Sequence, residues 1–116
     1  MNLHSAVFYT NDIEKVIPFY RDTLGFEVEY IQDSKFVSFI FPNGARLGIK
    51  QKKEDREIPG AQTVFISVEN IKETYNKLKS NPNITFLKEL VDDATWAPNF
   101  SITDPDKNKV QFVKEK

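Results

Sequence analysis

Few side chains in this sequence are suited to metal binding or acid–base chemistry, and the first of them is its single histidine. His4 stands in the apolar run HSAVFYT, where an imidazole is a candidate metal ligand or general base. The sequence contains no cysteine, so thiolate metal sites, cysteine nucleophiles and disulfides are excluded. Glu27 and Glu29 alternate with apolar residues in FEVEYI and are candidate general bases. Their use depends on the elements that position them.

A capped helix follows the first apolar run. Asn11 or Asp12 supplies the N-cap, Glu14 lies three residues after Asn11, and Gly25 supplies a left-handed stop. Pro18 falls inside this segment, so we expect a bend or a short, imperfect helix. The apolar residues recur at helical spacing and predict one face packed on a sheet: Ile13, Val16, Ile17, Tyr20 and Leu24.

The same order of strand, cap and helix recurs in TVFISVENIKETYNKLKS, with Asn70 as the cap and Glu73 three residues later. The displacement along the chain that carries position 13 to 71 superimposes the two helices, and we call it the helix shift. A slightly larger displacement, from position 47 to 110, superimposes the closing strands PNGARLGIK and PDKNKVQFV, and we call it the strand shift. The second half therefore carries about five extra residues in its middle.

Each half of the chain reads as a βαβββ module. We expect module one at about 1–52, a linker at about 53–60 and module two at about 61–116, together forming one domain over 1–116. The linker KKEDREIPG is charged and ends in Pro-Gly, which favours a solvated segment. The predicted fold is α+β, with two βαβββ modules forming a concave mixed sheet and the helices outside. Such a concave surface is a natural ligand site.

The charge balance argues against polyanionic partners. Sixteen Lys and Arg and seventeen Asp and Glu give a formal net charge of -1, so no electrostatic reason exists to expect nucleic acid or an anionic membrane surface. No apolar run approaches the ~20 residues of a membrane span, and the N-terminus lacks a signal-peptide pattern. We therefore expect a cytoplasmic protein with no nucleic-acid or membrane partner.

Three stretches of the sequence carry a resemblance to a known family. FYRDTLGFEVEY, SVENIKETYNKLK and TDPDKNKVQFV, in this order and with this repeat, resemble the vicinal oxygen chelate superfamily. That superfamily includes glyoxalase I, extradiol dioxygenases and the bleomycin- and fosfomycin-resistance proteins. The resemblance covers almost the whole chain and implies the fold. It implies much less about activity, because the fold supports isomerases, oxygenases, transferases and plain binding proteins.

The resemblance also implies where a metal ion would be held. In metal-dependent members the first and last strands of each module each supply one ligand, usually His, Gln or Glu. The matching positions here are Ser5, Gly48, Thr63 and Gln111, and the two repeat shifts pair the same positions. Hydroxyls, an amide and a glycine compensate a dication poorly for its lost hydration, so we expect no metal and no cofactor.

Strand alternation decides the expected role of His4. If Ser5 faces the ligand site, then Val7 and Tyr9 share its face and His4 points toward the helix layer. His4 is then a peripheral residue rather than a metal ligand. A one-residue bulge would reverse this assignment.

The same alternation predicts a mixed ligand-binding surface. Its residues are Ser5, Val7, Tyr9, Gly48, Lys50, Thr63, Phe65, Trp96 and Gln111, with Arg46, Ser67, Lys109 and Val113 on the same faces. For Val7, Phe65 and Val113, an equally good interpretation is packing across a module or dimer seam. Trp96 either stacks on a planar ligand or plugs the edge of the core.

These observations predict a metal-independent, homodimeric protein that binds a small organic molecule, sequestering a drug or metabolite as drug-resistance proteins do. Since the predicted faces hold no acidic residue or histidine, we favour binding over catalysis. The alternative is an enzyme: a glyoxalase- or dioxygenase-like one with a displaced metal site using His4, or a cofactor-free lyase or isomerase using Glu27 or Glu29. The face of these glutamates reaches either the cavity rim or solvent, and we favour solvent. A third interpretation is an interaction domain for a protein partner.

Overall fold

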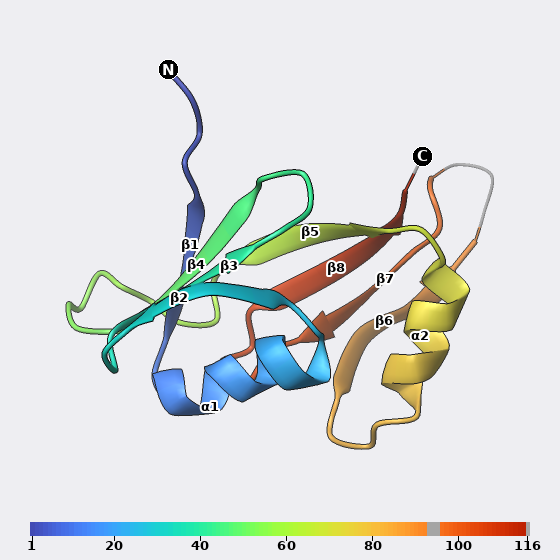
Figure 1. The fold of residues 1–116 in the computed structure, drawn as a ribbon. Coiled ribbons are helices and arrows are strands. Elements are labelled where there is room, and N and C mark those ends of the chain that lie inside the picture. The colour runs from blue at the N-terminus through green and yellow to red at the C-terminus, as the bar shows by residue number, and fades with distance from the viewer. Residues whose placement is uncertain (93–95, 116) are drawn as a thin grey trace. The chain divides into compact units, whose positions relative to one another are not determined.

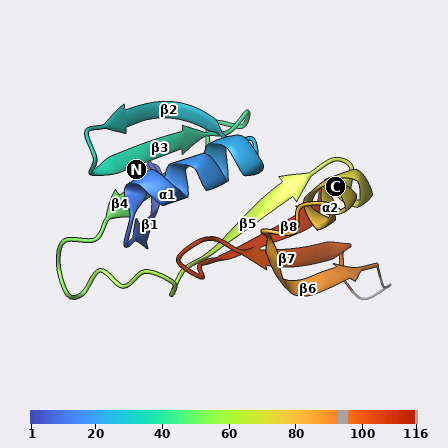
Figure 2. The same cartoon turned by 90° about the horizontal axis from the view of Figure 1, so that it is seen from below.

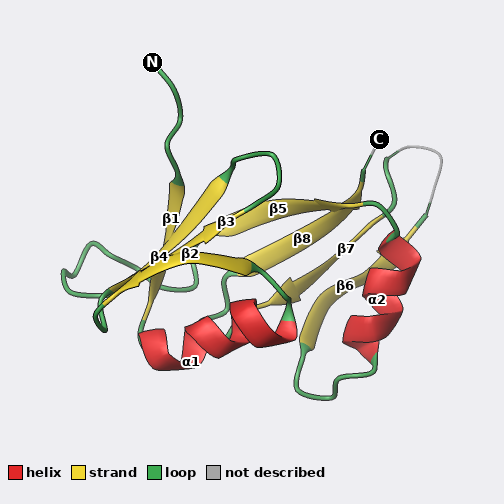
Figure 3. Cartoon of the chain, viewed as in Figure 1, coloured by secondary structure: helices red, strands yellow, loops and turns green. Residues whose placement is uncertain are grey.

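Two compact units make up the chain, Met1–Ala61 and Gln62–Lys116, in a computed structural model that describes residues 1–92 and 96–115. Each unit runs strand, helix and three strands, with one sheet and one helical segment (Figures 1 and 3). This α+β organisation confirms the predicted βαβββ modules. In the described part of the chain, no helix has the length and apolar character needed to span a membrane.

The first unit holds a four-stranded mixed sheet in the order β1-β4-β3-β2. Strands β1 and β4 are parallel, whereas β4 with β3 and β3 with β2 are antiparallel. The elements are β1 (Ala6–Thr10), α1 (Ile13–Pro18), the π-helical turn η1 (Phe19–Thr23), β2 (Glu27–Gln32), β3 (Phe36–Ile40) and β4 (Arg46–Gln51).

The first helix is short and irregular, as its proline predicts. Asp12 is the N-cap, and its side chain accepts a hydrogen bond from the Glu14 backbone N–H at 3.1 Å. The α-helix ends at Pro18 and continues as η1, because proline lacks the N–H that an α-helical bond needs. Gly25, at φ 78°, then terminates the segment in the left-handed region.

One face of this sheet packs against α1 and η1, as the views in Figures 1 and 2 show. Tyr20 is fully buried, and its ring centroid lies 5.7 Å from that of Phe39 and 5.5 Å from that of Phe26. The other buried apolar side chains of this layer are Phe8, Ile13, Val16, Val37, Leu47 and Ile49. The opposite face of the sheet is therefore left for other contacts.

The second unit repeats this arrangement with the sheet order β5-β8-β7-β6. Its helix has the predicted capping box, since Asn70 Oδ1 accepts from the Glu73 N–H at 3.1 Å and Asn70 Nδ2 donates to Glu73 Oε2 at 3.2 Å. The elements are β5 (Thr63–Val68), α2 (Ile71–Lys79), β6 (Thr85–Val91), β7 (Asn99–Thr103) and β8 (Lys109–Lys114).

The internal repeat holds at the level of strand register. Val7 pairs with Gly48 in the first unit. The helix shift carries Val7 to Phe65, the strand shift carries Gly48 to Gln111, and Phe65 pairs with Gln111 in the second unit. The larger strand shift takes over between β6 and β7, so the predicted insertion lies in that connection, where 93–95 are outside the described residues.

Both units also carry a bulge in the strand that follows the helix. It lies between Val28 and Tyr30 in β2, and between Phe86 and Lys88 in β6. A bulge places an extra residue on one strand and redirects the neighbouring side chains, so simple alternation does not hold across these positions.

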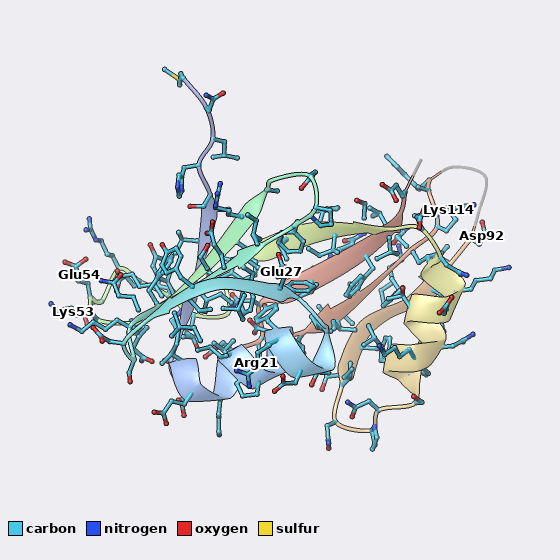
Figure 4. The ribbon with its side chains drawn as sticks, viewed as in Figure 1. Arg21, Glu27, Lys53, Glu54, Asp92 and Lys114 are labelled. Carbon is cyan, nitrogen blue, oxygen red and sulfur yellow. The ribbon has the colours of Figure 1, made fainter. Side chains whose placement is uncertain are left out.

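The predicted linker is not solvated throughout. Glu57 is only 6% exposed, and its carboxylate accepts from the backbone N–H groups of Lys53 (2.8 Å) and Glu54 (3.1 Å) and from the Lys50 ammonium. These hydrogen bonds, that of Lys50 first, lower the pKa of Glu57 from 4.5 to about 2. The side chains of Lys53 and Glu54 themselves point outward from the loop after β4 (Figure 4). One buried carboxylate thus fastens this segment to β4.

Candidate functional site

In the first unit, the sheet face opposite α1 carries most of the predicted ligand-binding residues. Along β1, Phe8 and Thr10 are buried, whereas Val7 and Tyr9 point to the other side. Val7 pairs with Gly48 and Tyr9 pairs with Lys50, so these positions share one face of the sheet. We call this surface the first face.

His4 and Ser5 precede β1, which begins at Ala6, so strand alternation does not position either side chain. His4 is exposed, and its Nδ1 lies 3.3 Å from Ser5 Oγ. The N-terminal segment extends away from the sheet (Figure 1). The exposed position agrees with a peripheral histidine, and no strand sets the direction in which its side chain points.

Gly48 lies beneath the aromatic ring of Phe36. A Cβ at Gly48 would stand 2.5 Å from Phe36 Cζ and 3.4 Å from Val7 Cγ2. Contacts below 3.0 Å require something to move, so any side chain at position 48 would make the end of the Phe36 ring shift from this place. An aromatic ring therefore occupies the place where the family resemblance puts a metal-binding side chain.

Glu29 is the acidic residue of the first face, contrary to our preference for solvent. Its bulged position in β2 lets it accept hydrogen bonds from Ser38 Oγ (2.8 Å to Oε1) and Arg46 Nε (2.8 Å to Oε2). These bonds, that of Arg46 first, lower the pKa of Glu29 below its usual value. Glu29 is therefore held ionised and is a weakened base, whereas Glu27 is exposed as expected.

Lys50 does not present to the first face the unpaired ammonium group that the sequence suggested. Its ammonium is paired with the buried carboxylate of Glu57. The cation is thus part of the anchor that fastens the segment after β4.

In the second unit, the sheet face opposite α2 carries the remaining predictions. Thr63, Phe65 and Ser67 are exposed at alternate positions of β5, and Phe65 is 64% exposed. Phe65 pairs with Gln111 of β8, which pairs in turn with Ser101 of β7. We call this surface the second face.

Three polar side chains on neighbouring strands of the second face are joined through one amide oxygen. Asn99 Oδ1 accepts from Lys88 Nζ at 2.9 Å and from Gln111 Nε2 at 3.2 Å, while Asn99 Nδ2 donates to the Ala97 carbonyl at 2.8 Å. Gln111 therefore acts here as a hydrogen-bond donor to a side-chain amide.

Ser101 lies next to these three side chains but forms no hydrogen bond with them. It pairs with Lys88 on one side and with Gln111 on the other, and it is 1% exposed. Within the described residues, its Oγ is the buried side-chain oxygen or nitrogen that has no hydrogen-bond partner. Such an atom has lost its hydration without compensation, which is costly and uncommon in folded proteins.

Trp96 is 75% exposed and comes shortly before β7. That exposure excludes the interpretation in which its ring plugs the edge of the core. The residues immediately before it, 93–95, lie outside the described residues.

The side chains at the positions implied by the family resemblance do not fit the ligand shell of a divalent ion. Ser5 and Thr63 offer neutral hydroxyls, and Gly48, under the Phe36 ring, has no side-chain donor atom. The Gln111 amide donates a hydrogen bond to Asn99 and carries no charge. Among residues 1–92 and 96–115, there is no grouping of three or more His, Asp and Glu side chains able to hold a metal ion.

The sequence interpretation missed five residues of these faces: Phe36, Ser38, Lys88, Asn99 and Ser101. A usable signal was present for the serines, because the strand shift pairs position 38 with 101. The same shift pairs position 36 with 99. For Lys88 the sequence held no such signal, since its position depends on the bulge in β6.

Solved structures with the same fold include proteins of different function. A member of the glyoxalase/bleomycin resistance protein/dioxygenase superfamily from Sphaerobacter thermophilus has 26% identity and a TM-score of 0.79, over 99% of this chain and 98% of that chain. A lactoylglutathione lyase from Agrobacterium tumefaciens has 17% identity and a TM-score of 0.78, over 97% and 92%. An antibiotic-binding protein from a Streptomyces species has 18% identity and a TM-score of 0.76, over 99% and 98%.

No curated protein shows significant similarity to the sequence. The family model of the glyoxalase/bleomycin resistance protein/dioxygenase superfamily, however, matches residues 2–112, nearly the whole chain. Together with the two βαβββ units, this match gives the family. The chain belongs to the glyoxalase/bleomycin resistance protein/dioxygenase superfamily.

Proposed function

We propose that this protein binds a small organic molecule without the help of a metal ion. The observation that carries the proposal is the Phe36 ring over Gly48, with Phe36 Cζ 2.5 Å from the place of a Cβ. A metal-binding side chain at this position would have to displace the ring. The neutral donors Ser5, Thr63 and Gln111 do not replace the missing charge.

We assign residues of each sheet face to ligand binding. The exposed apolar side chains Val7, Phe65 and Trp96 offer contacts to an apolar or planar ligand. The hydroxyl of Thr63 and the amide of Gln111 offer hydrogen bonds to oxygen functions. The remaining residues of the proposed site are Tyr9 and Lys50 on the first face, Gly48, which makes room there for the Phe36 ring, and Ser5, which precedes β1.

Binding is favoured over catalysis by the state of Glu29. A general base must be able to take up a proton near the working pH, whereas Glu29 is stabilised as a carboxylate by Arg46 and Ser38. The fold also accommodates this role, since an antibiotic-binding protein shares it. Sequestration of a drug or metabolite in the cytoplasm is therefore the activity that we propose.

We also propose that the protein is a homodimer. Large apolar side chains other than those assigned to ligand binding are exposed, among them Ile31 (47%) and Ile58 (56%). A second copy of the chain would cover such side chains. Light scattering coupled to gel filtration tests this, and a monomer at all concentrations would contradict it.

A ligand screen on chelator-treated protein tests the proposed binding. Since a ligand that binds only the folded state raises the melting temperature, thermal shift identifies binders without knowledge of their class. Trp96, the single tryptophan, provides an independent fluorescence signal, with Trp96→Phe as its control. A chemically diverse library that changes neither signal would contradict the proposal.

A further inference from the structure

The internal repeat provides a comparison between two buried serines. The strand shift carries Ser38 in β3 to Ser101 in β7. Each pairs with the residue that follows a bulge, Tyr30 in the first unit and Lys88 in the second. Both serines are nearly inaccessible, at 3% and 1% exposure.

In the first unit a carboxylate satisfies this serine. Ser38 Oγ donates to Glu29 Oε1, and Arg46 neutralises the same carboxylate through Oε2, with both distances at 2.8 Å. The hydroxyl, the carboxylate and the guanidinium thus satisfy one another's hydrogen bonds and charges. Hydrogen bonds to an ionised acceptor of this kind are among the stronger ones in proteins.

In the second unit the carboxylate is missing. The helix shift carries Glu29 to Leu87, an apolar residue that is 55% exposed. Ser101 Oγ has no partner within the described residues. Beside it, Lys88 donates to the neutral Asn99 amide, and no described carboxylate pairs with its ammonium. The serine and the cation are present here without the anion that accompanies them in the first unit.

We propose that the ligand of the second face is an organic carboxylate, whose anionic group binds Ser101 and Lys88. This inference rests on the proposed small-molecule binding and specifies its ligand class. Lys88 and Gln111 now share the Asn99 amide oxygen, which is a weaker acceptor than a carboxylate. Both side chains are long and flexible, so they can turn from Asn99 toward an anion placed over Ser101.

The strand order also sets the shape of this ligand. Phe65, Gln111 and Ser101 lie in one row across β5, β8 and β7. Strands two apart are separated by about 10 Å, so Phe65 lies at that distance from Ser101 along the row. A carboxylate on Ser101 therefore brings an attached aromatic or other apolar group over Gln111 and against the exposed Phe65 ring. An arylacetate has this form.

Amide chemical shifts of the full-length protein, titrated with phenylacetate and with neutral phenylacetamide, test the inference. We expect phenylacetate to shift the amide signals of Lys88, Ser101 and Gln111, and phenylacetamide to bind at least about tenfold more weakly, since it lacks the charge. Added salt should weaken only the phenylacetate response.

Variants locate the carboxylate. Ser101→Ala should weaken phenylacetate binding by about tenfold, the size expected for loss of a hydrogen bond to a charged group. Lys88→Gln, at an exposed position, should weaken it by about threefold. Ser38→Ala is the matched control. Ser38 is the equivalent serine of the first unit, and its hydroxyl already donates to Glu29, so this variant should leave phenylacetate binding unchanged.

Three results would overturn the inference: no shift of these amides with phenylacetate, equal affinity for the acid and the amide, or unchanged affinity in both Ser101→Ala and Lys88→Gln. The proposed function fails separately. If neutral compounds from the diverse library stabilise the protein while phenylacetate does not bind, small-molecule binding stands and the carboxylate inference falls. If no compound of any charge binds, both fall.

Discussion

Ser38 and Ser101 occupy equivalent positions in the two sheets, yet the two hydroxyls differ. Ser38 Oγ donates to Glu29, whereas Ser101 Oγ has no hydrogen-bond partner among the described residues. The difference originates on the neighbouring strand of each sheet, where one bulge carries Glu29 and the other Leu87. The repeated backbone therefore carries a serine at both positions, and among the described residues the first unit alone supplies a carboxylate acceptor, Glu29, for its serine.

Alanine at the two serines should have opposite effects on the ligand-free protein. Ser101→Ala removes a buried hydroxyl without a partner, so we expect the free energy of unfolding to stay constant or rise by up to about 1 kcal/mol. Ser38→Ala removes a made hydrogen bond and should lower it by about 1 kcal/mol. Urea denaturation of both variants measures this, and a larger loss for Ser101→Ala than for Ser38→Ala would refute the assignment.

The Glu57 anchor should give the protein an acid-sensitive contribution to stability. The pKa of Glu57 is lowered from 4.5 to about 2 in the folded state, so its carboxylate stabilises the fold above pH 4.5. As the pH falls from 4.5 to about 2, this contribution disappears because the carboxylate becomes protonated.

Melting temperatures of Glu57→Gln and the wild type across this range check the prediction. The variant should be less stable at neutral pH, and the difference should shrink toward pH 2. Glu54→Gln is the control, since Glu54 forms an exposed ion pair with Arg56 and should have little effect. A constant difference between Glu57→Gln and the wild type at all pH values would be inconsistent with the anchor.

A side chain at position 48 should conflict with Phe36. Gly48→Ala places a Cβ 2.5 Å from Phe36 Cζ, so we expect a loss of about 1–3 kcal/mol of stability from overpacking. The double variant Phe36→Ala, Gly48→Ala should lose less than the sum of the single variants, because the clash is gone. Additive effects in a denaturation double-mutant cycle would show that the ring does not lie over Gly48.

Phe65 should contribute to binding and not to folding. It is 64% exposed, so Phe65→Ser should change stability by no more than about 0.5 kcal/mol. Loss of its aromatic contact should weaken binding of any ligand found by about twofold to tenfold. Lys72→Ala, at an exposed position of α2, is the control and should leave affinity unchanged, whereas equal losses in both variants would argue against a role for Phe65.

Much of the fold could be predicted because the repeat constrains it twice. The helix caps at Asp12 and Asn70, together with the helix shift and the strand shift, indicated the order of the elements. The observed pairing of Phe65 with Gln111 agrees with both shifts, since it repeats a pair of the first sheet. The apolar stripe of each helix marked the packed face, because helical periodicity is a local property of the sequence.

The chemistry of the two faces was harder to predict, because it depends on cross-strand geometry. Simple alternation left the face of Glu29 open between the cavity rim and solvent, and we favoured solvent, but the bulge after Val28 brings its carboxylate to Ser38 and Arg46. A glycine at position 48 signals close approach of some group, yet the sequence does not say that the group is the Phe36 ring.

Ligand binding by metal-free protein is the most direct test of the account. The measurement is the melting temperature of chelator-dialysed protein across a diverse library that includes arylacetates, with and without added divalent metal. We predict that at least one compound raises the melting temperature without metal, and that metal adds nothing to its effect. Stabilisation that occurs only after a divalent metal is added would contradict metal-independent binding.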